Sequence, residues 1–172
     1  LELFAFRELY QFCKLHDILT WKNSGFKEMD STILQCLDIT NKIYNELDNG
    51  VDVCMVYLDV SKAFDKVWHV GLLHKLECIG VGGMLLKWFQ SYLTGRVQRV
   101  VIKGQSSKWY PVESGVPQGS VLGPLLFLIY TNDIVNNINC SIRIFADDTC
   151  LFNPIIDNES YMPLQSDLNK LA

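Results

Sequence analysis

Residues 141–152 read SIRIFADDTCLF: two short apolar runs, residues 141–146 and 149–152, joined by the pair Asp147-Asp148. Short β-branched runs on either side of a two-residue turn predict a β-hairpin. Because Asp suits hairpin turns, a purely structural turn is the simplest interpretation of the pair. Two adjacent carboxylates repel each other, however, and Asn-Gly or Asp-Gly would form the turn without that cost. The pair is therefore also a candidate functional site.

A further acid stands at the end of another apolar run. Residues 53–58 (VCMVYL) are typical of a strand covered on both faces, and Asp59 follows directly. The alternative role for Asp59 is an N-cap of the segment 61–67. If the apolar runs share one sheet, their terminal carboxylates could converge on Mg²⁺, which prefers oxygen ligands. Two such ions about 3.5–4 Å apart stabilise an in-line phosphoryl displacement, so the pattern predicts phosphoryl or nucleotidyl transfer.

The rest of the chain alternates between helical periodicity and hairpin-like pairs of short strands. The further expected elements are helices at residues 31–48, 72–79, 84–93, 120–136 and 161–171, and a hairpin of residues 97–103 and 108–113 with a turn at residues 104–107. Asp30 or Ser31 is expected to cap the helix that follows it, and Gly50 to end that helix. Because the strands come as hairpins rather than as repeated βαβ units, the predicted class is α+β.

The composition indicates one compact domain. Of 172 residues 49% are hydrophobic and the formal net charge is −4, which excludes a disordered chain. No apolar run approaches the ~18 residues of a membrane span. The chain begins at Leu1 without Met and ends inside an amphipathic run, so we expect a piece of a longer protein. The acidic balance argues against a nucleic-acid binder, but on this interpretation it describes only the piece.

The six cysteines predict neither disulfides nor zinc. None forms a C-x-x-C pair, and the three histidines lack zinc-ligand spacing. Most lie in apolar runs, where a thiol behaves as a small core side chain. We expect reduced, structural thiols in an intracellular protein.

Two further features suit a phosphate-bearing ligand. Residues 114–120 (SGVPQGS) combine two glycines with Gln118 before an expected helix, where backbone comes close to a ligand and anions are favoured. A simple strand-to-helix turn is the alternative. Basic residues interleave with aromatic ones in the middle of the chain, which suits a nucleic acid strand, although core packing also explains the aromatic rings. These residues are Lys62, Lys66, Trp68, Trp88, Tyr92, Arg96, Arg99, Lys103, Lys108 and Trp109.

Three blocks, in this order, resemble the reverse transcriptase domain of non-LTR (LINE-like) retrotransposons. VYLDVSKAFD at residues 56–65 resembles the first palm motif, SGVPQGSVLGP at residues 114–124 the second, and FADD at residues 145–148 the third. NSGFK at residues 23–27 resembles the segment before the palm, and SYLTGRVQRV at residues 91–100 resembles an insertion typical of this class. The resemblance runs from about residue 20 to the end.

The resemblance implies an α+β fold: the palm of a right-hand polymerase, an antiparallel sheet backed by helices, with a remnant of the fingers. Residues 1–50 would be the fingers remnant and the helix leading into the palm. Residues 51–172 would be the palm with its catalytic motifs, truncated before the thumb. The implied partners are an RNA template, a DNA primer, dNTPs and the rest of a parent polyprotein, with fingers, thumb and, as an open option, an endonuclease.

The same resemblance assigns the acids. Asp59 and Asp147 would be the main ligands of two Mg²⁺ ions, with Mn²⁺ as an option, and Asp148 would be the third acid, nearer the primer end. The primer 3′-hydroxyl would attack the α-phosphorus and release pyrophosphate. No membrane is implied, and the expected location is a cytoplasmic ribonucleoprotein and the nucleus. The chain alone is expected to have little or no polymerase activity.

Three further residues receive roles in the nucleotide pocket. Phe64 would lie under the sugar and disfavour a 2′-hydroxyl, while Gln118 and Gly119 would line the nucleotide and template side. Two alternatives stay open: an inactive, retroelement-derived RNA-binding or interaction module, and another two-metal phosphotransferase such as a nuclease.

Overall fold

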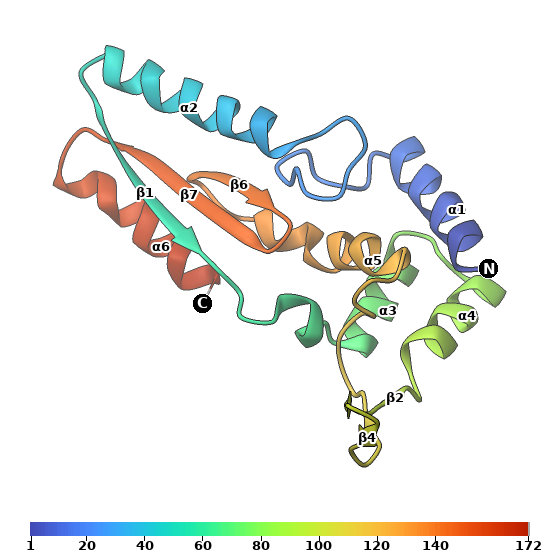
Figure 1. Ribbon diagram of the computed structural model, residues 1–172. Helices are drawn as coiled ribbons and strands as arrows, with labels where there is room; N and C mark the ends of the chain where they lie inside the picture. Colours follow the sequence, from blue (N-terminus) through green and yellow to red (C-terminus); the bar gives the residue numbers. More distant parts are fainter. Residues whose placement is uncertain (172) are drawn as a thin grey trace. The chain divides into compact units, whose positions relative to one another are not determined.

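The computed structural model describes residues 1–171, and contacts divide the chain into two compact units (Figure 1). One unit joins Leu1–Ile18 to Lys62–Tyr130, and the other joins Leu19–Ser61 to Thr131–Ala172. Helices combine with antiparallel strands, so the predicted α+β class is confirmed. The division predicted at residue 50 stays a prediction. Among residues 1–171, no helix is both long and apolar enough to cross a membrane.

The sheet of the second unit has three antiparallel strands in the order β1-β7-β6. β1 is Asp52–Leu58, β6 is Ser141–Phe145 and β7 is Asp148–Ile155. All three predicted strands are present, and β7 is longer than expected at both ends. β1 is less completely covered than expected: it lies at the edge of the sheet, none of its residues is fully buried, and its Tyr57 is 72% exposed.

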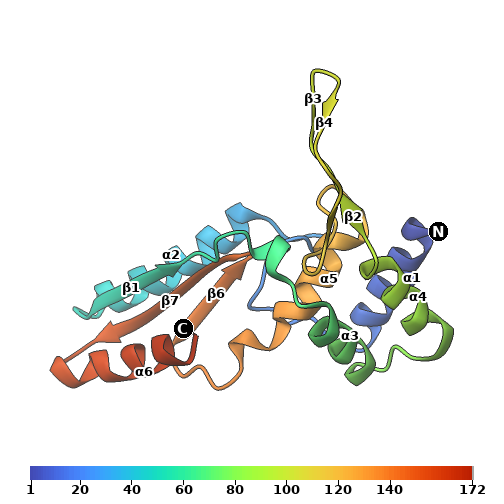
Figure 2. The same cartoon turned by 90° about the horizontal axis from the view of Figure 1, so that it is seen from below.

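Two helices of this unit cover opposite faces of the sheet, α2 (Thr32–Asp48) one face and α6 (Tyr161–Leu171) the other (Figures 1 and 2). The predicted cap is confirmed, because Ser31 Oγ accepts a hydrogen bond of 3.3 Å from the Leu34 N–H. Side chains alternate between the faces of a strand. The α6 face carries the apolar core, which consists of Val135, Cys140, Ile142, Ile144, Leu151 and Leu164, with Cys54, Val56, Leu58, Ile134, Ile138, Leu168 and Leu171 packed against it.

The first unit is mainly helical. Its α-helices are α1 (Glu2–Leu15), α3 (His69–Cys78), α4 (Gly83–Leu93) and α5 (Leu122–Thr131), and it contains the 3-10 turn η1 (Ala63–Lys66). A second 3-10 turn, η2 (Asn132–Val135), follows α5 and belongs to the second unit. α5 is therefore shorter than the expected helix over residues 120–136. α1 was not predicted from the sequence, although its buried residues Ala5, Leu9 and Cys13 recur every fourth position, as one face of a helix requires.

The predicted hairpin is present in this unit as four short strands. They are β2 (Val97–Gln98), β3 (Val101–Ile102), β4 (Gln105–Ser106) and β5 (Tyr110–Pro111). Its turn lies at Lys103-Gly104 rather than at residues 104–107, because Ile102 pairs directly with Gln105.

All six cysteines are free thiols. Cys13, Cys140 and Cys150 are buried. Burial raises the pKa of Cys13 to about 11, so this thiol stays protonated and unreactive near neutral pH.

A fully buried carboxylate joins α6 to the start of β6. Asp167 accepts hydrogen bonds from the backbone N–H groups of Asn139 at 2.7 Å and Cys140 at 2.8 Å, and it pairs with Lys170 at 2.7 Å. Burial alone would raise the pKa of Asp167, but these donors outweigh it and hold the pKa at about 2. The folded state therefore favours the carboxylate over the acid.

Replacing this carboxylate should destabilise the protein in a pH-dependent way. The free Asp pKa is about 3.9, so the depressed pKa of Asp167 stabilises the fold by about 2–3 kcal/mol above pH ~4. This contribution is lost as the pH falls towards 2. We expect Asp167→Asn to lower the free energy of unfolding by about 2 kcal/mol at pH 7 and to flatten the dependence of stability on pH between 5 and 2.

Urea unfolding of the wild type and variant across this pH range measures both effects. Asp48→Asn, an exposed position at the end of α2, serves as the control. Equal stability of Asp167→Asn and wild type at pH 7 would contradict the assigned role.

Candidate active site

The antiparallel register brings Asp59 and Asp148 to the same end of the sheet. Leu58 pairs with Thr149 in the β1–β7 ladder, so Asp59 follows β1 at the place where Asp148 begins β7. Both side chains are exposed, and both line one cavity. The alternative role of Asp59 as a helix cap is wrong, because Lys62 occupies the N-cap of η1.

The hairpin turn between β6 and β7 is Ala146-Asp147, not Asp147-Asp148. Phe145 pairs with Asp148, which leaves two residues to make the turn. Ala146 has φ +58°, a left-handed conformation that costs a residue with a Cβ atom about 1 kcal/mol or more. Asp147 is half-buried at the second turn position, next to the strand that begins with Asp148.

A segment from before α2 supports this turn from the side. Asn23 forms a parallel bridge with Ile144 of β6, and the Ser24 N–H donates to the Ile144 carbonyl at 2.9 Å. Gly25 follows, and a Cβ atom built on it would lie 2.4 Å from the backbone nitrogen of Ala146. The Asn23 Oδ1 accepts from the Gly25 N–H at 3.0 Å, so this close approach is fixed locally. Only glycine fits here without moving the turn.

The cavity beside the two acids has a volume of about 540 Å³ and lies between α2 and the sheet. Its lining consists of Thr32, Gln35, Cys36, Ile39, Thr40 and Ile43 from α2, and Met55, Tyr57, Leu58, Asp59, Phe145, Asp148, Thr149 and Cys150 from the sheet side. Gln35 is 9% exposed, and within the described part of the chain its Oε1 has no hydrogen-bond partner. The cavity therefore has apolar walls with acids at one end.

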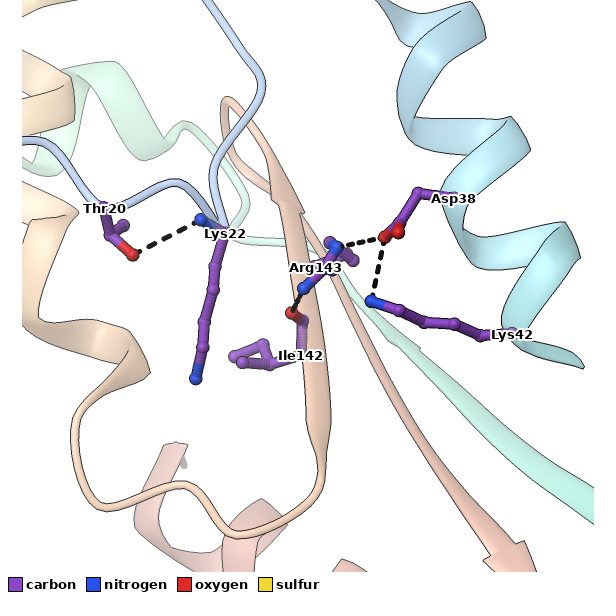
Figure 3. Close-up of polar contacts among 6 residues, drawn as sticks. All are labelled: Thr20, Lys22, Asp38, Lys42, Ile142 and Arg143. Carbon is purple, nitrogen blue, oxygen red and sulfur yellow. Dashed lines mark hydrogen bonds and ion pairs between the residues drawn. The ribbon is translucent and has the colours of Figure 1, made fainter.

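An ion pair between the buried Arg143 and the partly exposed Asp38 joins α2 to the sheet (Figure 3). Arg143 of β6, with 6% of its side chain exposed, donates from Nε to Asp38 Oδ2 of α2 at 2.6 Å. Lys42 reaches the same oxygen at 3.0 Å, and the Arg143 guanidinium lies 4.2 Å from the ring centroid of Trp21. Burial would raise the pKa of Asp38, but hydrogen bonds from Arg143 and Lys42 hold it below the usual range.

We did not identify this pair from the sequence. The available signal is the lone Arg143 inside the apolar strand SIRIF, since a buried cation requires a partner.

The donor set suits a hard divalent cation. Mg²⁺ usually takes one or two protein carboxylates together with water and substrate phosphate, and Asp59 and Asp148 offer two carboxylates to one cavity. Among residues 1–171, no three His, Cys, Asp or Glu side chains lie close enough together to hold a metal by themselves. The residues therefore fit an ion that is completed by substrate oxygens rather than one enclosed by protein.

The other predicted site residues, Phe64, Gln118 and Gly119, belong to the first unit, whereas the three acids belong to the second. The loop of residues 114–118 is attached to the η1 segment by three backbone-directed bonds. Gly115 N–H donates to the Val67 carbonyl at 2.8 Å, Val116 N–H to the Phe64 carbonyl at 2.9 Å, and Ser114 Oγ to the Asp65 carbonyl at 2.8 Å.

Gly115 is essential to this contact, because it has φ +87° and an added Cβ atom would lie 2.7 Å from Asp65 Cα.

This attachment orients Gln118 and Phe64. Gln118 Nε2 donates to Asp65 Oδ1 at 3.0 Å, and both residues line a cleft of about 610 Å³. Phe64 stacks on Phe127 of α5, with ring centroids 4.3 Å apart and an angle of 15° between the rings. Gly119 is exposed with φ +76°. Phe64 and Gln118 thus lie on two segments, η1 and the loop of residues 114–118, that hydrogen bonds hold together.

The Gly25 contact yields a direct test. Gly25→Ala should lower the free energy of unfolding by about 2 kcal/mol, because the new methyl group overpacks against the Ala146 backbone. Gly82→Ala is the matched control, since nothing lies within 4 Å of a Cβ atom there. Thermal or urea unfolding of both variants measures the difference. If Gly25→Ala is as stable as Gly82→Ala, the turn is not held by this contact.

Comparisons with known proteins identify the family. The family model for reverse transcriptase (RNA-dependent DNA polymerase) matches residues 4–171. The probable RNA-directed DNA polymerase from transposon BS of Drosophila melanogaster is 32% identical over 92% of this chain and 19% of that protein. The RNA-directed DNA polymerase from mobile element jockey of the same species is 33% identical over 74% of this chain and 15% of that protein. The chain thus spans less than a fifth of the length of these relatives.

A solved structure shares the fold at low sequence identity. The structure of apo telomerase from Candida tropicalis, truncated from its C-terminal domain, matches with a TM-score of 0.68 and 14% identity, over 98% of this chain and 37% of that one. This likeness supports a palm-like α+β fold. Together with the match to the family model, which covers nearly the whole chain, it shows that this protein belongs to the reverse transcriptase (RNA-dependent DNA polymerase) family and is of the non-LTR retrotransposon type.

Proposed function

We propose that this chain is the catalytic palm region of an RNA-directed DNA polymerase that adds dNTPs to a primer 3′-hydroxyl on an RNA template. The observation that carries the proposal is the position of Asp59 and Asp148, which line one cavity where β1 ends and β7 begins. Asp147 stands in the adjoining turn. Carboxylates at one end of a sheet, with space beside them for a substrate, suit nucleotidyl transfer.

Asp59, Asp147 and Asp148 are the proposed ligands of two Mg²⁺ ions, with Mn²⁺ as an alternative. When bound, such ions neutralise charge on the attacking and leaving oxygens of a phosphoryl displacement. The primer 3′-hydroxyl would attack the α-phosphorus of the dNTP, and pyrophosphate would leave. The role of the protein is to hold the acids at fixed positions, which the strand register and the Gly25 contact support.

The proposed nucleotide side uses the first unit. Phe64 would lie under the sugar and exclude a 2′-hydroxyl, and its stacking on Phe127 supports a fixed ring. Gln118, oriented by Asp65, and Gly119 would line the nucleotide and template side. Both loop and ring belong to segments joined by backbone hydrogen bonds, which favours their acting together.

The proposal extends to partners and location. An RNA template, a DNA primer and dNTPs are the proposed ligands. A longer parent protein with fingers, a thumb and an optional endonuclease is the proposed context. A cytoplasmic ribonucleoprotein and the nucleus are the proposed locations.

Primer extension by the full-length protein tests the proposal. On an RNA template with a DNA primer and Mg²⁺, we expect Asp59→Asn and Asp147→Asn each to lower the rate at least about a hundredfold, because the cation loses a ligand. Asp52→Asn, at the opposite end of β1, should keep the wild-type rate.

Synthesis by either acid variant at the control rate would refute the metal-ligand roles. Primer cleavage without extension by the wild-type protein would indicate a nuclease instead. RNA binding without any synthesis would indicate an inactive module.

A further inference from the structure

The hairpin of the first unit, residues 96–111, has a defined backbone without a core of its own. Lys103 and Gly104 both have positive φ, +48° and +80°, which is the signature of a tight type I′ turn. Gln98 pairs with Tyr110, and Val101 with Ser106. Two residues on the first strand therefore face three on the second, which is a β-bulge that increases the local twist. We call residues 96–111 the arm.

The bulge places a cation on an aromatic ring. Arg99 is one of the two residues facing the bulge, and its guanidinium carbon lies 4.6 Å from the ring centroid of Trp109 on the opposite strand. Next to this contact two hydrogen bonds join the strands. The Ser107 N–H donates to the Val100 carbonyl at 2.9 Å, and the Val100 N–H donates to Ser107 Oγ at 3.0 Å. Arg99 is thus pre-oriented while its outer face stays exposed.

Every residue from position 97 to 111 is exposed, and the arm extends away from the helices of its own unit (Figure 2). Its large apolar side chains are between 57% and 64% exposed, namely Val97, Val100, Val101, Ile102, Trp109 and Tyr110. An isolated two-stranded ribbon is marginally stable in water. Exposed apolar side chains gathered on one ribbon mark an interaction surface.

Charge selects the class of partner. Residues 96–111 contain four of the 15 Lys and Arg of the chain and none of its 19 Asp and Glu. Arg96 is engaged at the base, where it donates to the Gly115 carbonyl at 3.2 Å, while Arg99, Lys103 and Lys108 lie on the exposed part. An otherwise acidic protein therefore presents one purely basic ribbon, which is complementary to a polyanion.

The position of the arm connects it to the nucleotide side. Arg96, Gln98 and Pro111 at its base line the same cleft as Gln118 and Asp65. A chain of phosphates that leaves this cleft along the arm would meet Arg99, Lys108 and then Lys103 at the tip. This continuous path from the cleft to the arm favours a nucleic acid over a second protein as the partner.

We propose that the arm binds the phosphate backbone of a nucleic acid duplex, through Arg99, Lys103 and Lys108, next to the cleft that contains Gln118. This inference rests on the proposed function for the identity of the duplex, an RNA–DNA hybrid. Phosphate contacts of this kind position a duplex without reading its sequence. The arm therefore holds hybrids of any sequence equally.

Duplex binding by the full-length protein tests the arm. The probe is a fluorescently labelled RNA–DNA hybrid, and its affinity is measured by anisotropy between 50 and 200 mM salt. Arg99→Gln combined with Lys103→Gln should reduce the slope of log K against log salt by about 2 and weaken binding roughly tenfold to a hundredfold. The matched control is Arg7→Gln with Lys87→Gln, exposed cations on α1 and α4 with the same change in charge.

An unchanged slope for the arm variant, or equal weakening by the control, would overturn the proposal. Equal unfolding midpoints of the two variants establish that the arm variant is folded. Binding is measured without catalysis, so a protein that binds through the arm but synthesises no DNA would refute only the polymerase function. A protein that synthesises DNA while the arm variant keeps the wild-type slope would refute only the arm.

Discussion

The antiparallel register of β1, β7 and β6 is the constraint on which the candidate site depends. Leu58 pairs with Thr149, and Phe145 with Asp148, so the carboxylates of Asp59 and Asp148 come to one end of a single sheet. Side chains alternate with a period of two, and a slip of one residue would turn every side chain to the other face. The apolar core on the α6 face resists such a slip, because it would expose Ile142, Ile144 and Leu151.

Contacts on three sides make this register difficult to change. α6 packs on one face, and its buried Asp167 binds the backbone just before β6. On the other face, the Arg143–Asp38 pair joins β6 to α2, and the buried Arg143 would be costly without this partner. At the tip, Gly25 contacts the Ala146 turn. A hairpin with a strained, non-glycine turn is thus supported by packing around it.

Local patterns predicted the elements well where one periodicity dominated. The spacing of α2, its cap at Ser31 and the apolar strands all follow from residues adjacent in the chain. The β1–β7 pairing joins residues about 90 to 100 positions apart, and no local pattern sets its register. The turn lies at Ala146-Asp147 rather than at the predicted Asp147-Asp148. The left-handed Ala146 is supported by Gly25, which is far away in the sequence, so no local pattern indicates it. The Arg143–Asp38 pair also joins residues far apart in the chain.

The distribution of charge along the chain differs from what its net charge indicates. A net charge of −4 argues against nucleic acid when it is averaged over 172 residues. The structure separates acids at the tips of strands, which suit cations, from a basic ribbon without a single acid. A net charge averaged over the chain does not show this separation of acidic and basic regions.

Mn²⁺ binding followed by NMR tests most directly the proposal that the strand register brings acids together at a divalent-cation site. In an isotope-labelled sample of this chain with a dNTP present, substoichiometric Mn²⁺ should broaden the amide signals of Asp59 and residues 147–149 before any others. The same signals should stay sharp in Asp59→Asn at equal Mn²⁺. Broadening that is uniform, or strongest away from the ends of β1 and β7, would contradict the claim.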